Sequence, residues 1–264
     1  MKISMIGAGN VAWHLSIALE DHHHQVCEVY SRKQVKARAL VSMLYQAKVK
    51  TDLDFSESNA EVFILAVADD AIAEVCSMLV LPENAILVHT SGTKSLEDLQ
   101  NLMIAHHDLP VRCGVFYPLM TFSIQKKMSL KEVPFCIEAE EASAEDKLVQ
   151  LAQSVSNTVY LISSRERKVL HVAAVFACNF TNHLLALANE ITTEENLEFE
   201  LLKPLIKETF QKALLADHPA DVQTGPAIRG DKSTINTHLL YLNNQPDLFE
   251  IYEVMSESIR KWHS

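Results

Sequence analysis

A glycine-rich segment near the start of the chain has the residue types and spacing that bind a phosphate group. Positions 7–12 (GAGNVA) follow an apolar run at positions 2–6 and precede a stretch with apolar residues at helical spacing. Gly7 would form the tight turn from strand to helix, and Gly9, which has no Cβ, would let a phosphate approach the backbone. The free N–H groups and the dipole of the helix N-terminus would favour the negative charge. The pattern predicts a dinucleotide-binding turn, and a turn of purely structural glycines is the alternative.

The residues after the second predicted strand indicate which dinucleotide is bound. In such folds an acidic residue at this point holds the ribose 2′-OH of NAD, whereas a hydroxyl and an arginine accommodate the 2′-phosphate of NADP. Here the strand 25–30 is followed by Ser31, Arg32 and Lys33, with no carboxylate. The segment therefore predicts NADP, with NAD less favoured. The alternative is that Arg32 and Lys33 are solvated residues at the start of the next helix.

Small residues at the ends of later strands would border the same cofactor. Ala66, Val67 and Ala68 end a buried apolar run, where the chain would cross the middle of the dinucleotide. Asp69 and Asp70 follow, and we interpret them as helix N-caps rather than an acid/base pair, because Asp is a strong capping residue. The residues expected at the cofactor are Gly7, Ala8, Gly9, Asn10, Val11, Ser31, Arg32, Ala66, Val67, Ala68, Ile72, Thr90 and Ser91.

A histidine at the end of another strand could take part in the chemistry. His89 would lie near the nicotinamide ring and could donate a proton, or it could be a hydrogen-bonded structural histidine, and both interpretations stay open. The sequence has no metal-ligand spacing and no Gly-x-Ser-x-Gly nucleophile elbow. We therefore expect no bound metal and no hydrolase chemistry.

Alternating strands and helices must position these residues. Apolar strand-like runs occur at positions 2–6, 25–30, 61–67, 85–89, 112–117, 134–138 and 158–162, with helical patterns between most of them. Runs that are apolar throughout are typical of parallel strands buried on both faces. The sequence predicts an α/β domain, residues 1–163, with a doubly wound Rossmann sheet and ligands at the carboxyl ends of its strands.

The rest of the chain is helical in pattern. Helices are expected at about 165–189, 199–215, 234–242 and 247–262, so an all-α domain, residues 164–264, should follow a boundary near residue 163. A helix as apolar as 169–188 must be buried nearly all round, and one hundred helical residues offer a limited core for it. We therefore expect a homodimer that forms through the helical domain.

Composition limits the classes of partner. The 264 residues have a formal net charge of −11, which argues against a broad nucleic-acid or anionic-membrane surface. No run of about 18 apolar residues is evident and the first strand begins at once, so neither a membrane span nor a signal peptide is expected. The five cysteines form no CxxC pair, which is typical of reduced thiols in the cytoplasm.

Several segments together resemble a known family. They are positions 6–12, 89–92, 114–123 (GVFYPLMTFS), 173–180 (AAVFACNF) and 224–231 (TGPAIRGD), followed by His238. With these segments the whole chain resembles the Rossmann-like DUF2520 proteins, relatives of pyrroline-5-carboxylate reductase, prephenate dehydrogenase and 6-phosphogluconate dehydrogenase. The resemblance implies an NADP-binding domain, a helical dimerisation domain like the C-terminal domain of 6-phosphogluconate dehydrogenase, and an active site between them. It implies no established substrate.

The resemblance draws attention to further candidate side chains. The family that this chain resembles often has His at the position of Tyr117. If that position supplies a catalytic base, a phenol would have to replace the imidazole in this chain. Arg229 in the loop 224–231 offers a bidentate fork for a carboxylate or phosphate, or it could be tethered to Asp231 within the loop. His171 could face the substrate, and Asn179, a polar residue in an apolar helix, needs either substrate or a backbone group as partner.

The sequence thus predicts an NADP-dependent oxidoreductase. Hydride would move to or from a keto or imino group of a small polar metabolite, for which we expect a carboxylate, with a proton from His89, Tyr117 or His171. The candidate catalytic residues are His89, Tyr117, His171, Asn179 and Arg229. An NADP-binding sensor or scaffold without turnover is the alternative, and a reductase that uses a deazaflavin is a weaker one.

Overall fold

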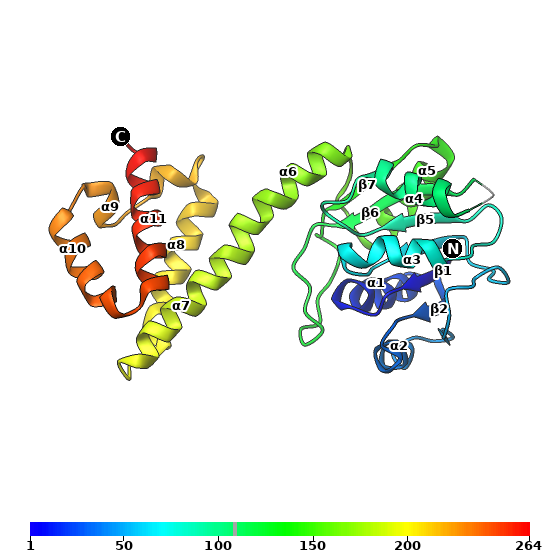
Figure 1. Ribbon diagram of the computed structural model, residues 1–264, viewed down its shortest axis with the longest axis horizontal. Helices are drawn as coiled ribbons and strands as arrows, with labels where there is room; N and C mark the ends of the chain where they lie inside the picture. The colour runs from blue at the N-terminus through cyan, green and yellow to red at the C-terminus, as the bar shows by residue number, and fades with distance from the viewer. Residues whose placement is uncertain (108–109) are drawn as a thin grey trace. The chain divides into compact units, whose positions relative to one another are not determined.

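The computed structural model describes residues 1–107 and 110–264, which separate into two compact units, Met1–Cys178 and Asn179–Ser264 (Figure 1). The first unit contains the strands β1 (Lys2–Ile6), β2 (Gln25–Tyr30), β3 (Lys48–Lys50), β4 (Val62–Leu65), β5 (Ile86–His89), β6 (Arg112–Pro118), β7 (Phe135–Ala139) and β8 (Val159–Leu161). They form one sheet in the order β3-β2-β1-β4-β5-β6-β7-β8, parallel throughout except between β6 and β7. The strand order reverses between β1 and β4, which is where ligands bind in such sheets. The predicted Rossmann architecture is confirmed.

Helices cover both faces of this sheet. They are α1 (Asn10–Asp21), α2 (Gln34–Val41), α3 (Ile72–Met78), α4 (Leu96–His106) and α5 (Ala142–Val155). Helices α1, α2 and α5 contribute to one hydrophobic cluster, and α3 and α4 contribute to the other. Successive residues of β4 alternate between the clusters: Val62 and Ile64 belong to the first, Phe63 and Leu65 to the second. Because side chains alternate across a strand, an apolar run is buried on both faces at once.

Two local features differ from the sequence expectations. The edge strand β3 was not predicted, because its three residues, Lys-Val-Lys, do not form an apolar run. Lysines are common on edge strands, where they oppose pairing with another sheet. The helical pattern in the sequence after the second strand runs from Val35 to Tyr45, whereas α2 ends at Val41.

From Ser164 onward the described elements are helical. They are α6 (Ser164–Ala174), a π-helix (Val175–Phe180), α7 (Thr181–Glu194), α8 (Lys203–Leu215), α9 (Pro226–Arg229), α10 (Lys232–Tyr241), α11 (Pro246–Trp262) and the short 3₁₀ turns Phe199–Leu202, Pro219–Val222 and Leu242–Asn244. Ser163 begins α6 with a capping box, in which its side chain accepts from the Glu166 N–H. The secondary structure therefore changes at Ser163/Ser164, whereas the two compact units divide inside the continuous helix, after Cys178.

The long helix Ser164–Glu194 is exposed in this chain, contrary to the expected burial. Among its residues, all of which the structure describes, Arg167 is the one buried side chain. Several apolar side chains of this helix, such as Val169 and Val172, are exposed in the part of the chain that the structure describes. By length and composition alone this helix could cross a membrane, a feature that the sequence analysis did not find, and a single helix of this kind is weak evidence for a membrane span. A helix that is covered by another protein surface can have the same length and apolar composition as a membrane-spanning helix.

Candidate functional site

The glycine turn between β1 and α1 has open space where a phosphate would lie. The Gly7 N–H donates to the Tyr30 carbonyl oxygen at 2.8 Å, and the Gly7 φ is +122°. A Cβ on Gly7 would lie 2.2 Å from the Ala66 carbonyl oxygen, so the fold requires glycine there. A Cβ on Gly9 would meet no atom within 4 Å. The N–H groups of the first turn of a helix have no partner within the helix, and such groups favour a phosphate. The turn therefore fits a dinucleotide pyrophosphate.

A hollow of about 260 Å³ lies beside the turn and has a cationic side. Its lining includes Arg32, Lys33 and Lys36, with Ser31 beside them. This composition fits the 2′-phosphate of NADP, because three positive charges and a hydroxyl favour an added anion. Lys36 was not predicted, although it lies one helical turn after Lys33. The predicted residues that line the hollow are Gly7, Ala8, Gly9, Ser31, Arg32, Ala66, Val67 and Ala68.

Other residues predicted at the cofactor do not line this hollow. The Asn10 side-chain amide donates to the Phe122 carbonyl oxygen at 2.9 Å, so it ties α1 to the segment after β6. Val11 lies in the first turn of α1 and contributes a backbone N–H there. Ile72 is buried in the hydrophobic cluster under α3, so its side chain is a core residue and not a cofactor contact.

The segments after β4 and β5 are joined by an aspartate. The Asp69 carboxylate accepts from the Ser91 hydroxyl at 2.8 Å and from the Thr93 hydroxyl. It makes no helix-capping hydrogen bond, so the N-cap interpretation of Asp69 was wrong. Thr90 donates from its hydroxyl to the Leu65 carbonyl oxygen at 3.3 Å. The hydroxyls of Thr90 and Ser91 thus hold the two strand ends together, and a cofactor would meet this rigid edge.

His89 has the environment of a structural histidine. It is fully buried, and its Nδ1 accepts from the Ser91 N–H at 3.2 Å while its Nε2 lies 3.4 Å from the Ser95 carbonyl oxygen. Burial, followed by the positive charge of Arg167, lowers the pKa of His89 to about 4. The ring is neutral near pH 7 and both nitrogens face the backbone. His89 is therefore not in a position to donate a proton to a substrate.

Tyr117 and His171, the other two predicted proton donors, lie together. The Tyr117 Oη atom is 3.0 Å from His171 Nδ1, although the residues are 54 positions apart in the chain. A Cβ on Gly92 would lie 2.4 Å from the same Nδ1, so only glycine at position 92 leaves room for the imidazole. Burial, followed by the nearby Cys136, raises the pKa of Tyr117 to about 12, and the charge of Arg167 opposes this shift. The phenol is therefore protonated at neutral pH and hydrogen-bonded to the His171 ring.

An ion pair with a buried arginine, which sequence reasoning missed, joins α6 to β7. Arg167 is fully buried, and its Nη1 is 2.6 Å from Glu138 Oε2. Its Nη2 donates to the Lys94 carbonyl oxygen and to the Ser164 hydroxyl. No pattern in the sequence distinguishes Arg167 from its exposed neighbour Arg165, so only the tertiary structure identifies it.

The two candidate residues of the second unit are exposed. Asn179 lies in the π-helix, and its side chain is not the buried polar group that its apolar neighbours suggested. Arg229 ends α9. The Asp231 carboxylate instead caps α10, where it accepts from the Thr234 N–H at 3.1 Å and from the Thr234 hydroxyl at 2.7 Å. The ion pairs of the described residues do not include an Arg229–Asp231 tether.

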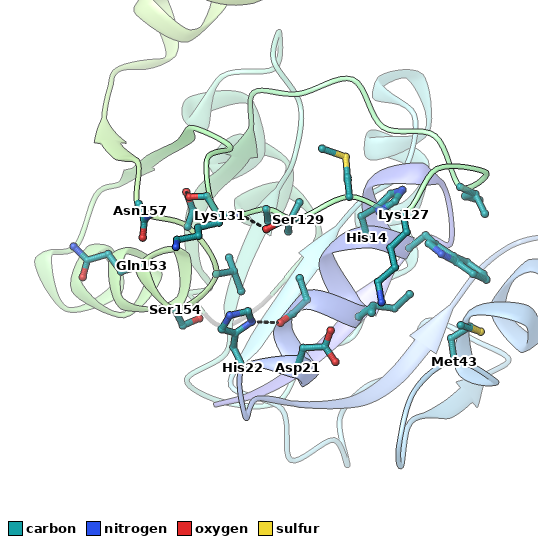
Figure 2. Close-up of a pocket in the computed structure, with 18 of the residues that line it drawn as sticks. His14, Asp21, His22, Met43, Lys127, Ser129, Lys131, Gln153, Ser154 and Asn157 are labelled. Carbon is teal, nitrogen blue, oxygen red and sulfur yellow. Dashed lines mark hydrogen bonds between the residues drawn. The ribbon is translucent and has the colours of Figure 1, made fainter.

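A larger hollow of about 750 Å³ lies elsewhere on the first unit, between α1, the end of α5 and residues 124–131 (Figure 2). The labelled residues around it include His14, Asp21, His22 and Lys127. Both histidines are used locally, because His22 Nδ1 lies 2.8 Å from the Ala18 carbonyl oxygen and His14 Nε2 lies 2.9 Å from that of Ser123. The hollow is lined by none of the residues predicted for the cofactor or the chemistry.

Comparison with known proteins identifies the family. Residues 133–259 match the profile described as "Domain of unknown function (DUF2520)", and residues 2–92 match "NADP oxidoreductase coenzyme F420-dependent". A candidate NADP oxidoreductase from Bacteroides fragilis, BF3122, is 40% identical, with 98% of each chain covered and a TM-score of 0.88. The chain belongs to the same family. The predicted family is confirmed, and NADP is the cofactor named for it.

More distant structures share the fold of this DUF2520 family member. A reductive aminase from Aspergillus terreus, solved with NADPH and ethyl-5-oxohexanoate, is 12% identical over 98% of this chain and 94% of its own, with a TM-score of 0.71. The 1-pyrroline-5-carboxylate reductase of Streptococcus pyogenes is 11% identical over 99% and 98%, with a TM-score of 0.64. The search of curated proteins finds no match.

Proposed function

We propose that this family member is an NADPH-dependent reductase that acts on a C=N or C=O group of a small polar metabolite that carries a carboxylate. The observation that carries the proposal is the partly buried Tyr117–His171 hydrogen bond of 3.0 Å, which lies in the same unit as the glycine turn. The fold shared with a reductive aminase and a pyrroline-5-carboxylate reductase supports an imine or ketone as the acceptor. The hydride would add to the carbon atom and the proton to the nitrogen or oxygen atom.

The nucleotide would be held by backbone groups and by cations. The N–H groups of the first turn of α1 would bind the pyrophosphate, with Gly9 leaving the space for it. Ser31, Arg32 and Lys36 would bind the 2′-phosphate. When bound, the cofactor supplies the hydride.

The proton would come from the phenol. Tyr117 stays protonated at neutral pH, because burial raises its pKa to about 12. Its hydroxyl would give a proton to the substrate nitrogen or oxygen, and a proton on His171 Nδ1 would then neutralise the phenolate. His89 takes no part, since its ring is buried against the backbone.

The helical residues would provide the carboxylate site and the contact with a second copy. Arg229 is exposed and presents a guanidinium fork that suits a carboxylate, and Asn179 is an exposed polar side chain on the apolar helix. Exposed apolar residues such as Val169 and Val172 support a homodimer that covers this helix. We place the protein in the cytoplasm because its five cysteines are free thiols.

The cofactor claim is tested by thermal shift with NADPH and NADH. Bound ligand at a hundred times its dissociation constant stabilises by about 2.7 kcal/mol, so NADPH should raise the Tm more than NADH. Arg32→Asp should reduce the preference for NADPH at least tenfold, about 1.4 kcal/mol. Arg38→Asp is the matched control, because Arg38 is an exposed arginine on α2, which begins two residues after Arg32, and it does not line the hollow. Equal or absent shifts for the two nucleotides would contradict the proposal.

The reductase claim is tested by NADPH oxidation with a panel of imino and keto acids. Tyr117→Phe should lower kcat about a hundredfold without changing the NADPH thermal shift, because general acid catalysis contributes that much. Tyr160→Phe is the control, since Tyr160 is exposed on β8. Tight NADPH binding with no oxidation by any compound would favour a sensor without turnover instead.

A further inference from the structure

The first turn of α6 is held by a buried cation rather than by apolar packing. Arg167 contacts two separate parts of the sheet unit: Glu138 at the end of β7 and the Lys94 carbonyl oxygen in the segment after β5. Glu138 also accepts from the Ser164 N–H at 2.9 Å and from the Ser164 hydroxyl at 2.7 Å. The start of α6 is thus fixed to two strand ends at once.

An ion pair is an expensive way to anchor a helix. Burial of the Arg167 charge removes its hydration, while Glu138 stays partly exposed, and replacing such a pair with apolar residues of similar volume is often neutral or stabilising. Arg167 Nε is in addition a buried donor without a hydrogen-bond partner among the described residues. A role in anchoring alone would not explain why this position holds an arginine.

The geometry connects Arg167 directly to the proton-donating pair. Arg167 and His171 are four residues apart on α6, so they lie on the same face of the helix. The segment after β5 contacts both of them, with Gly92 against the His171 ring and the Lys94 carbonyl oxygen on Arg167. A shift of the first turn of α6 would therefore move His171 relative to Tyr117.

Arg167 also supplies charge at the phenol. The groups that act electrostatically on Tyr117 are Cys136, Asp69 and Arg167, and only Arg167 is positive among them. Its charge lowers the pKa of Tyr117, whereas burial, Cys136 and Asp69 raise it. A cation at this place stabilises the phenolate that proton donation leaves behind.

We propose that Arg167, held by Glu138, is a positioning residue for the Tyr117–His171 pair: it fixes the first turn of α6 so that His171 Nδ1 reaches the Tyr117 hydroxyl, and its charge stabilises the phenolate. This inference rests on the proposed function for its kinetic consequence. The positioning of the His171 ring itself can be measured without turnover.

The experiment uses the full chain with three variants and a control. Arg167→Met removes the charge, Arg167→Lys keeps the charge but loses the fork, and Glu138→Gln removes the partner of the guanidinium. Arg165→Met is the matched control, because Arg165 is an exposed arginine in the same helical turn. The readouts are the ¹⁵N signals of the His171 ring, assigned with His171→Gln, and the pH profile of kcat for NADPH oxidation.

Arg167→Met should move the His171 ring signals, lower kcat at least tenfold and displace the pH profile to higher pH, because the phenolate loses its cation. Arg167→Lys should keep the pH profile while kcat falls, since charge remains and position changes. Arg165→Met should change neither readout. If Arg167→Met does not fold, Glu138→Gln should move the same ring signals.

Unchanged ring signals and an unchanged pH profile in folded Arg167→Met, or in Glu138→Gln, would overturn the inference and leave Arg167 as an anchor only. If none of the imino and keto acids tested supports NADPH oxidation by the wild-type protein, that result would instead contradict the proposed function. In that case the ring signals still decide whether Arg167 positions His171, so the two failures are distinguishable.

Discussion

The sheet and the helices after Ser163 use their apolar residues in opposite ways. Every residue of β4 and β5 is buried, because helices of the same unit cover both faces of the sheet. Among residues 164–264, all described, only Arg167, Ala227 and Leu242 are buried, while Val169 is 64% exposed and Leu214 is 83% exposed. The first region completes its core by itself. The second contains the apolar helix Ser164–Glu194, in which Arg167 is the one buried side chain, which is why we propose a second copy as its cover.

The largest expected effect on stability is at Gly7, in the sheet region whose helices complete its core. Gly7→Ala would place a Cβ 2.2 Å from the Ala66 carbonyl oxygen at a φ of +122°, and we expect the free energy of unfolding to fall by about 4 kcal/mol from strain and overpacking. Urea unfolding of the protein without nucleotide measures this.

Gly9→Ala is the control for that experiment. A Cβ there meets no atom within 4 Å, so urea unfolding should be unchanged while the NADPH thermal shift is lost, since the methyl group occupies the space for phosphate. Equal losses of stability in Gly7→Ala and Gly9→Ala would contradict the assignment of Gly7 to folding and Gly9 to nucleotide binding.

His89 should make the same region sensitive to acid. Its pKa is lowered to about 4 in the folded protein from an ordinary 6.5, so the unfolded chain binds a proton that the folded chain does not. The free energy of unfolding should therefore fall as the pH drops below 6.5 and level off near 4. The total loss from this residue is about 3 kcal/mol.

Variants at two histidines isolate this contribution. His89→Asn can still accept from the Ser91 N–H but does not titrate, so the difference in stability between it and the wild type should shrink as the pH falls from 6.5 to 4. His263→Asn, at an exposed residue, should keep the wild-type slope. An identical slope in His89→Asn would contradict the buried neutral ring.

Introducing one negative charge into each of the two regions tests the comparison between them directly. Val169 and Val35 are both highly exposed valines, at 64% on α6 and 77% on α2. Val169→Asp should weaken self-association at least a hundredfold, about 2.7 kcal/mol, because a carboxylate would be buried in the contact. Val35→Asp should leave association unchanged, and sedimentation equilibrium measures both. A monomeric wild-type protein, or equal effects of Val169→Asp and Val35→Asp on self-association, would contradict a homodimer that forms through the helices.

The smallest expected effects are in the segment 224–231, where Asp231 should contribute to stability and Arg229 to substrate binding. Asp231→Ala removes the cap of α10 and should lower the free energy of unfolding by about 1 kcal/mol. Arg229→Ala should leave stability unchanged, because Arg229 is exposed at the end of α9, but should raise the KM for an acidic substrate. A stability loss in Arg229→Ala as large as that of Asp231→Ala would favour the tether interpretation.

Local patterns were enough to predict the glycine turn and the cationic hollow on which the proposed nucleotide site rests. The turn at Gly7 and Gly9 and the cations that begin with Arg32 depend on a few consecutive residues, whose conformation follows from a strand that runs into a helix. Asp69 was misread for a related reason. The residue type that caps a helix also accepts hydrogen bonds from distant hydroxyls, and only the fold decides between these roles.

The sequence by itself determined the alternation of strands and helices, the phosphate-binding turn and the change to helices at Ser164, because each depends on periodicity and conformation within a few residues. The tertiary structure alone decided which side chains meet. It brought Tyr117 to His171 across 54 positions, paired Arg167 with Glu138 and enclosed His89. Such contacts depend on how strand ends and a helix converge in space, and no local pattern contains that information.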